Sequence, residues 1–242
     1  MQLYRQVLMR NMRNTISKIW LTFALLLLGG LVMTMNGQVR YCMNYTEFVK
    51  GQWKTAEHVS VVKKNEAMKR IVQSSDYQME ADDEALKKLL NKKAFAVEID
   101  HTLYVNCRSF RHQGVRFGAG YAVAFRMGND KLCVVNRKVG TSTLIETGVV
   151  TGLTSFTPLV VGAIASAGLT EVQLANQVCY MVDSEAGSNG KTKVTQIGDL
   201  LMPELLGNQK ALLEKYHAVG DKRTRQSAMN VLAVLHEAKL IK

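Results

Sequence analysis

Proline is scarce in this chain: only two of its 242 residues are proline, while 47% are hydrophobic. This is the composition of an ordinary globular protein with one core, or with one core and a satellite. The five histidines are scattered without ligand spacing, and no two cysteines form C-x-x-C. These absences disfavour a metal site, and nothing else in the sequence indicates a cofactor.

Short catalytic motifs are also missing. GSNGKT at 187–192 has Glu185 where a phosphate-binding loop needs its first glycine, and a strand pattern follows where that loop needs a helix. GAGYAV at 118–123 has Val123 where a dinucleotide fingerprint needs its third glycine. Neither G-x-S-x-G nor H-E-x-x-H occurs. We therefore expect a tight turn at the first motif and part of a strand meander at the second.

Acidic residues are absent from the first 37 residues, where basic residues up to Lys18 precede an apolar run at 19–33. This order is typical of a secretory signal, so residues 1–37 are predicted to be a signal peptide, with a retained N-terminal anchor as the alternative. The expected localisation is the periplasm or the outer-membrane-associated cell envelope. The net charge is +11, and because four positive charges lie in the leader, the remainder carries +7. Such a basic exported protein favours membrane surfaces, anionic glycans or acidic proteins over nucleic acid.

The cysteines are few and even in number. Cys42, Cys107, Cys133 and Cys179 allow three disulfide pairings in an exported protein. Cys133 and Cys179 lie inside apolar, strand-like runs, where a buried thiol behaves as a small hydrophobe. Buried free thiols are therefore preferred here, and a disulfide is the alternative.

Alternation between apolar and polar residues dominates the middle of the chain. Residues 38–93 are mixed and end in a helix predicted at 82–93, with one strand expected at 58–62. Residues 94–198 predict an antiparallel β-meander. Gly118 and Gly120 within it predict a bulge or a close approach of two backbones.

A charge-free stretch of 24 residues, 147–170, divides this meander. Its length would suit a lipid bilayer, but Pro158 splits it into arms that are each too short to span. Its small residues instead suit close packing, so we expect a buried apolar crossover, either a helical hairpin or an irregular segment. Membrane insertion is the alternative. The residues expected to line the tight contact, within the chain or between copies, are Gly148, Gly152, Gly162, Ala163, Ser166 and Ala167.

Residues 199–242 return to helical spacing, and the last helix is predicted to run from Asp221 to Lys239. Its first turn would then hold Lys222, Arg223 and Arg225, against the preference of the helix dipole for negative charge at that end. These three cations are therefore candidates for contact with an anion. A solvated charged face is the alternative.

Several segments resemble an uncharacterised family of exported proteins of Gram-negative bacteria. They are LYVN (103–106), VRFGAGYA (115–122), LCVVN (132–136), VVGAIASAG (160–168), VCYMVD (178–183) and LLEKY (212–216). The small-residue segment also resembles the glycine zippers of envelope proteins, although Phe156 and Pro158 interrupt the pattern. Because the family has no assigned activity, the resemblance implies no functional residue.

Together these features predict an α+β fold: an antiparallel meander sheet, an apolar crossover and C-terminal helices. The preferred function is a non-catalytic envelope module that uses the apolar segment for packing or self-association and its basic surface for anionic partners. The alternative is a hydrolase of envelope material whose site is assembled in space. Asp100, His101 and His112 would then be its candidate catalytic residues.

Overall fold

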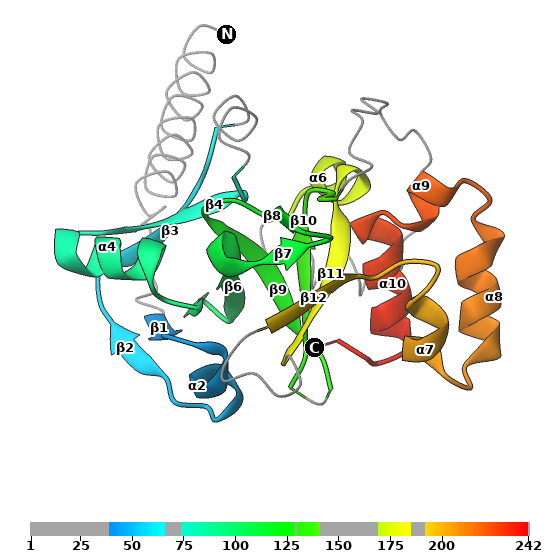
Figure 1. Ribbon diagram of the computed structural model, residues 1–242, viewed down its shortest axis with the longest axis horizontal. Coiled ribbons are helices and arrows are strands. Elements are labelled where there is room, and N and C mark those ends of the chain that lie inside the picture. Colours follow the sequence, from blue (N-terminus) through cyan, green and yellow to red (C-terminus); the bar gives the residue numbers. More distant parts are fainter. Residues whose placement is uncertain (1–38, 66–73, 129, 141–168, 185–191, 242) are drawn as a thin grey trace, which may run out of the picture. The chain divides into compact units, whose positions relative to one another are not determined.

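Antiparallel pairing organises the protein, as the computed structural model in Figure 1 shows. The structure describes residues 39–65, 74–128, 130–140, 169–184 and 192–241. The chain divides into two units, 1–37 and 38–242, and all described residues belong to the second. The main-sheet strands are β1 (Val39–Cys42), β2 (Lys54–Ala56), β3 (Val59–Lys63), β4 (Tyr77–Ala81), β5 (Ala96–Ile99), β6 (Thr102–Asn106), β9 (Tyr121–Arg126), β10 (Leu132–Asn136), β11 (Val178–Ser184) and β12 (Thr192–Gln196).

The order across this sheet is β12-β11-β10-β9-β6-β5-β1-β2, and every neighbouring pair is antiparallel. The sheet forks at β9, because β4 pairs with β9 at Tyr77 and Tyr121 and also carries β3. A separate two-stranded ribbon consists of β7 (Arg111–His112) and β8 (Val115–Arg116).

Short helices connect and cover the strands. In chain order they are α2 (Tyr45–Val49), α4 (Glu84–Lys92), the 3-10 turn η1 (Cys107–Ser109), α6 (Glu171–Asn176), α7 (Met202–Leu206), α8 (Lys210–Ala218), α9 (Lys222–Arg225) and α10 (Ala228–Glu237). Within the described part of the chain, no helix is long and apolar enough to cross a membrane.

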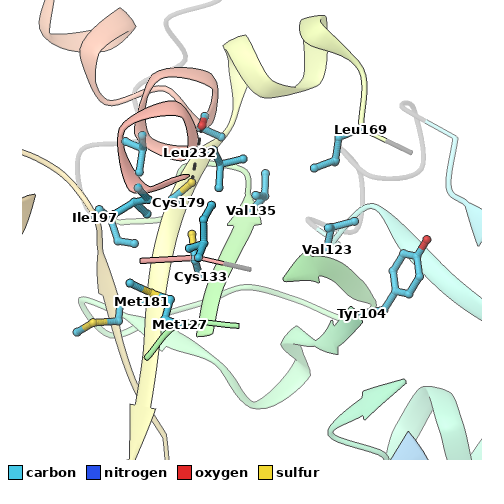
Figure 2. Close-up of a cluster of buried hydrophobic side chains, with 14 of the residues drawn as sticks. Tyr104, Val123, Met127, Cys133, Val135, Leu169, Cys179, Met181, Ile197 and Leu232 are labelled. Carbon is cyan, nitrogen blue, oxygen red and sulfur yellow. Dashed lines mark hydrogen bonds between the residues drawn. The ribbon is translucent and has the colours of Figure 1, made fainter. Parts of the chain in front are cut away.

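Both faces of the sheet are buried, because apolar residues occupy successive positions along its central strands. In β9, Val123 points to a core covered by α4, α6, α7, α8 and α10, and Ala124 belongs to the opposite core, which contains α2 and η1 residues. Figure 2 shows Val135, Cys179 and Leu232 in the first of these cores, between the sheet and α10. Burying each such aliphatic side chain contributes about 1.5–3 kcal/mol.

The four cysteines are divided between the two cores, and all are buried free thiols. Cys133 and Cys179 lie on neighbouring strands in the core of Figure 2. Burial raises the pKa of Cys42 and of Cys107 to about 12. Both thiols are therefore protonated, and poor nucleophiles, at neutral pH.

The α+β fold and the antiparallel sheet predicted from the sequence are confirmed, but the predicted strand limits were too narrow. The prediction placed the meander between 94 and 198 and one further strand at 58–62, which matches β3 to within one residue, whereas β1, β2 and β4 also precede residue 94. The expected close approach at Gly120 is present: a Cβ there would lie 2.8 Å from the Tyr77 carbonyl oxygen.

The last helix was predicted as one element, and the structure corrects this. It contains two helices, α9 and α10, separated at Gln226 and Ser227. The Ser227 hydroxyl donates to the Thr224 carbonyl and accepts from the Asn230 N–H, so it closes one helix and caps the next.

The apolar stretch falls largely outside the described residues. This holds for all six residues expected to line its contact, Gly148, Gly152, Gly162, Ala163, Ser166 and Ala167. At its end, Thr170 caps α6 through a reciprocal capping box with Gln173. Because β10 and β11 are direct neighbours, the connection that contains this stretch joins adjacent strands of the sheet.

Candidate functional site

A pocket of about 390 Å³ lies where α2, the end of α4 and η1 meet. Cations, small polar groups and apolar side chains line it together. The lining residues are Met43, Asn44, Tyr45, Lys92, Lys93, Ala94, Phe95, Asn106, Arg108, Ser109 and Thr192. They come from several separate segments of the chain, so only the folded protein forms this surface.

Two of the cations come from the end of α4. Lys92 is the last residue of this helix and Lys93 is its C-cap, where the Lys93 N–H donates to the Leu89 carbonyl over 2.8 Å. Positive charge is favourable at a helix C-terminus because it offsets the negative end of the dipole. This explains why lysines end the helix, and both side chains remain exposed.

The third cation, Arg108, is brought to the same place by Asn106. The Asn106 carboxamide oxygen accepts from the Arg108 N–H over 3.1 Å. Its nitrogen lies 3.5 Å and 3.4 Å from the Leu90 and Asn91 carbonyl oxygens at the end of α4. One buried amide thus holds η1 against the last turn of α4, and Arg108 is exposed beside the two lysines.

The apolar part of the pocket is rigid. The rings of Tyr45 and Phe95 pack edge to face, with centroids 5.6 Å apart and planes at 88°. The Tyr45 hydroxyl donates to the Asp130 carbonyl over 2.9 Å, which fixes the ring. Burial, followed by the charges of Asp183 and Asp130, raises the Tyr45 pKa to about 12, so the phenol is neutral at physiological pH.

Among the described residues, no carboxylate lines the pocket. The Glu47 carboxylate lies near it but is engaged at the start of α2, where it accepts from the Met43 N–H over 2.8 Å and from the Asn44 amide over 3.0 Å. The ion pairs found in the described ranges involve none of the three cations. The pocket therefore presents three positive charges that the described residues do not neutralise.

The candidate catalytic residues are not brought together. Asp100 and His101 form the turn between β5 and β6, with φ of 49° and 63°, and both are exposed. Positive φ at two successive residues is the requirement of a tight hairpin turn. His112 lies beyond the other end of β6, in β7, where its ring packs against Tyr180 and its Nδ1 lies 3.2 Å from the Val194 carbonyl oxygen. Within the described ranges, no three His, Cys, Asp or Glu residues could hold a metal ion.

Lys222, Arg223 and Arg225, which the sequence suggested for contact with an anion, have different surroundings. Arg225 donates two hydrogen bonds of 3.0 Å to the Asp199 carboxylate and a third to the Val219 carbonyl. It therefore fastens α9 to the turn that precedes α7, whereas Lys222 is exposed and Arg223 half-buried. Because α9 has only four residues, its first turn is also its last. The helix dipole therefore no longer singles out an anion site there, and contact of these cations with an anion stays a prediction.

The sequence offered only a partial signal for the pocket. Lys92 and Lys93 fit the ordinary pattern of a helix end, so their sequence position alone does not indicate that they also bind an anion. Arg108 follows a buried strand, and nothing in the spacing of the chain links it to residues 92 and 93.

These observations define the class: an α+β protein whose antiparallel sheet is buried on both faces and which carries a basic pocket between α2, α4 and η1. A family model described as "Family of unknown function (DUF6563)" matches residues 40–239. The chain therefore belongs to this family, which confirms the resemblance to an uncharacterised family. Export and the glycine zipper stay predictions. No curated protein and no solved structure matches the chain.

Proposed function

We propose that the protein is a non-catalytic binding module of the cell envelope whose basic pocket holds an anionic group of its partner. The observation that carries this proposal is the gathering of Lys92, Lys93 and Arg108 around one pocket, with no carboxylate among its described lining residues. The helix dipole explains why each of the two lysines lies at the end of α4. It does not explain why Arg108 of η1 lines the same pocket. Pockets that combine an apolar wall with a few convergent polar groups are the usual form of a ligand site.

The envelope assignment comes from the leader and the charge. Residues 1–37 have the order of a secretory signal, and the remaining chain carries a net charge of +7. Outside the cytoplasm, the abundant anions are lipid headgroups, acidic glycans and acidic proteins. In this proposal the apolar stretch 147–170 supplies packing or self-association, separately from the pocket.

The test is a comparison of two variants from which the same charge is removed. Lys92→Gln/Lys93→Gln/Arg108→Gln removes the pocket cations, and the control Lys88→Gln/Lys222→Gln/Arg223→Gln removes two lysines and one arginine elsewhere. Both are titrated with a heparin fragment, a sulfated glycan, after circular dichroism has established that they are folded. Because the pocket variant can no longer form charge-assisted hydrogen bonds with the anion, its binding should weaken at least about tenfold, or about 1.4 kcal/mol.

The control should weaken much less, because diffuse surface charge is screened by salt. If both variants weaken equally, binding reflects net charge alone and the pocket has no special part in it. If only the control weakens, the anion is bound outside the pocket, by a surface that includes Lys88, Lys222 or Arg223.

A further inference from the structure

The charge of the pocket limits the valence of its ligand. Lys92, Lys93 and Arg108 line it with three positive charges, and none of its described lining residues is acidic. A carboxylate, a sulfate ester or a phosphodiester would neutralise one of these charges. A phosphate monoester carries about −1.5 to −2 at neutral pH and offers three acceptor oxygens, so it comes closer to matching the site.

The donors are of the types that phosphate needs. A guanidinium presents a planar fork that can bind two phosphate oxygens at once, and ammonium groups act as point charges on the third. Ser109 and Thr192 add hydroxyl groups to the same lining. Asn44 and Asn106 contribute less, because their carboxamides are already bonded within α2 and to η1.

The size and the apolar wall require more than a phosphate. A volume of about 390 Å³ is in the range of pockets for whole small molecules, roughly 300–1,000 Å³. Tyr45, Ala94 and Phe95 are buried apolar residues in the lining, and an inorganic anion gains nothing from them. A ring or other partly apolar body attached to the phosphate would cover this wall.

We propose that the pocket binds a terminal phosphate monoester carried on a ring-shaped body such as a sugar. This rests on the proposed function and narrows it to one ligand chemistry. The phosphate can belong to a soluble phosphorylated sugar or to a phosphomonoester headgroup at a lipid surface. The recognised group is the same in both.

The second ionisation of the phosphate provides a specific signature. Its pKa is about 6, so the monoester becomes a dianion between about pH 5 and about pH 7.5. The charged groups that face the ligand are Lys92 and Lys93 from α4 and Arg108 from η1. Tyr45 on α2 is neutral there, Glu47 on α2 is held at the helix start, and the described lining contains no histidine. Affinity for a monoester should therefore rise with pH, and affinity for a sulfate should not.

The experiment is a calorimetric titration of the full chain with glucose 6-phosphate, glucose 6-sulfate and glucuronate, at about pH 5 and at about pH 7.5. We expect glucose 6-phosphate to bind tightest, with an association constant that rises up to about tenfold across this range. The conservative variant Arg108→Lys keeps the charge but removes the fork, and should reduce this preference without unfolding the protein. Equal, pH-independent affinities for the phosphate and the sulfate would overturn the inference.

A second arm identifies the source of the phosphate. Phosphatidylcholine vesicles containing phosphatidic acid, a monoester, are compared with vesicles containing phosphatidylglycerol, a diester, using the wild type and the pocket variant. Pocket-dependent preference for phosphatidic acid assigns the site to a lipid headgroup, and binding of glucose 6-phosphate alone assigns it to a soluble ligand. Equal binding to both lipids contradicts the monoester. If heparin binding depends on the pocket but no phosphate is preferred, this inference is wrong and the proposed function stands. If neither heparin nor any phosphate binds through the pocket, both the inference and the proposed function are wrong.

Discussion

Gly120 lies immediately before β9, next to the point where the sheet forks, and its replacement by alanine should be severely destabilising. Its φ is +118°, and an added Cβ would lie 2.5 Å from Lys64 Nζ, 2.8 Å from the Tyr77 carbonyl oxygen and 3.2 Å from the Ser75 carbonyl oxygen. The lysine can move, but the carbonyls cannot move freely, because Tyr77 lies in β4 and the Ser75 N–H donates to the Ala119 carbonyl. Backbone strain of about 1–3 kcal/mol and overpacking of about 1–3 kcal/mol together predict a loss of about 2–6 kcal/mol.

Two other glycines separate these contributions. Gly51 has a φ of +65° but open space around it, so Gly51→Ala should show the strain alone. Gly220 has open space and no positive φ, so Gly220→Ala should be neutral or slightly stabilising. Urea unfolding of the four proteins, followed by circular dichroism, measures the differences. If Gly120→Ala unfolds within about 0.5 kcal/mol of the wild type, the close packing of β4 against β9 is wrong.

Two further substitutions test single polar contacts. Hydrogen bonds from Arg225 are the chief reason that the Asp199 pKa is held below its usual range. The ionised carboxylate therefore stabilises the folded protein above the unfolded pKa of about 3.9, and this contribution is lost as the pH falls through the folded pKa. Asp199→Asn should therefore cost about 1–3 kcal/mol at neutral pH, and denaturation at falling pH should show the gap to the wild type closing below about pH 4; a gap independent of pH would contradict the ion pair. Tyr180→Phe removes the hydroxyl that accepts from the buried Val139 N–H over 2.7 Å, which should cost about 1–3 kcal/mol and speed hydrogen exchange at Val139. Unchanged exchange there would refute this assignment.

The sequence was most informative where one strand face or one helix face repeats over many residues. Strands β5 and β6 lie where the apolar–polar alternation predicted them, β9 to β11 are short apolar runs bounded by turn residues, and α4 begins at its acidic first turn and ends at its lysines. Such local patterns reflect the burial of one face or both, so a short window is enough to detect them.

The strands that the sequence did not predict, β1, β2 and β4, are too short or too irregular to show such a local pattern. β1 has four residues and β2 has three, and β1 is held by pairing with β5, more than 50 residues away in the chain. β4 alternates only between Tyr77 and Met79 before charged residues follow. Tertiary pairing determines these elements, and no local propensity predicts it.

The break between α9 and α10 shows a different limit. Residues 222–239 have helical spacing throughout, and the interruption depends on the side chain of Ser227, which closes one helix and caps the other. Serine is neutral enough inside helices that its presence alone does not predict a cap. The pocket is harder still to predict, because it needs Asn106 to join η1 to the end of α4.

Chemical footprinting of lysines tests the anion pocket most directly, because it needs no substitution. The protein is treated with an amine-reactive ester with and without a saturating heparin fragment, and the modification of each lysine is measured by mass spectrometry. The proposed pocket predicts that Lys92 and Lys93 become strongly protected, while Lys88, which is exposed on the same helix and does not line the pocket, keeps its rate. Equal protection of the three lysines, or protection centred on Lys222, would contradict the assignment of the anion site to this pocket.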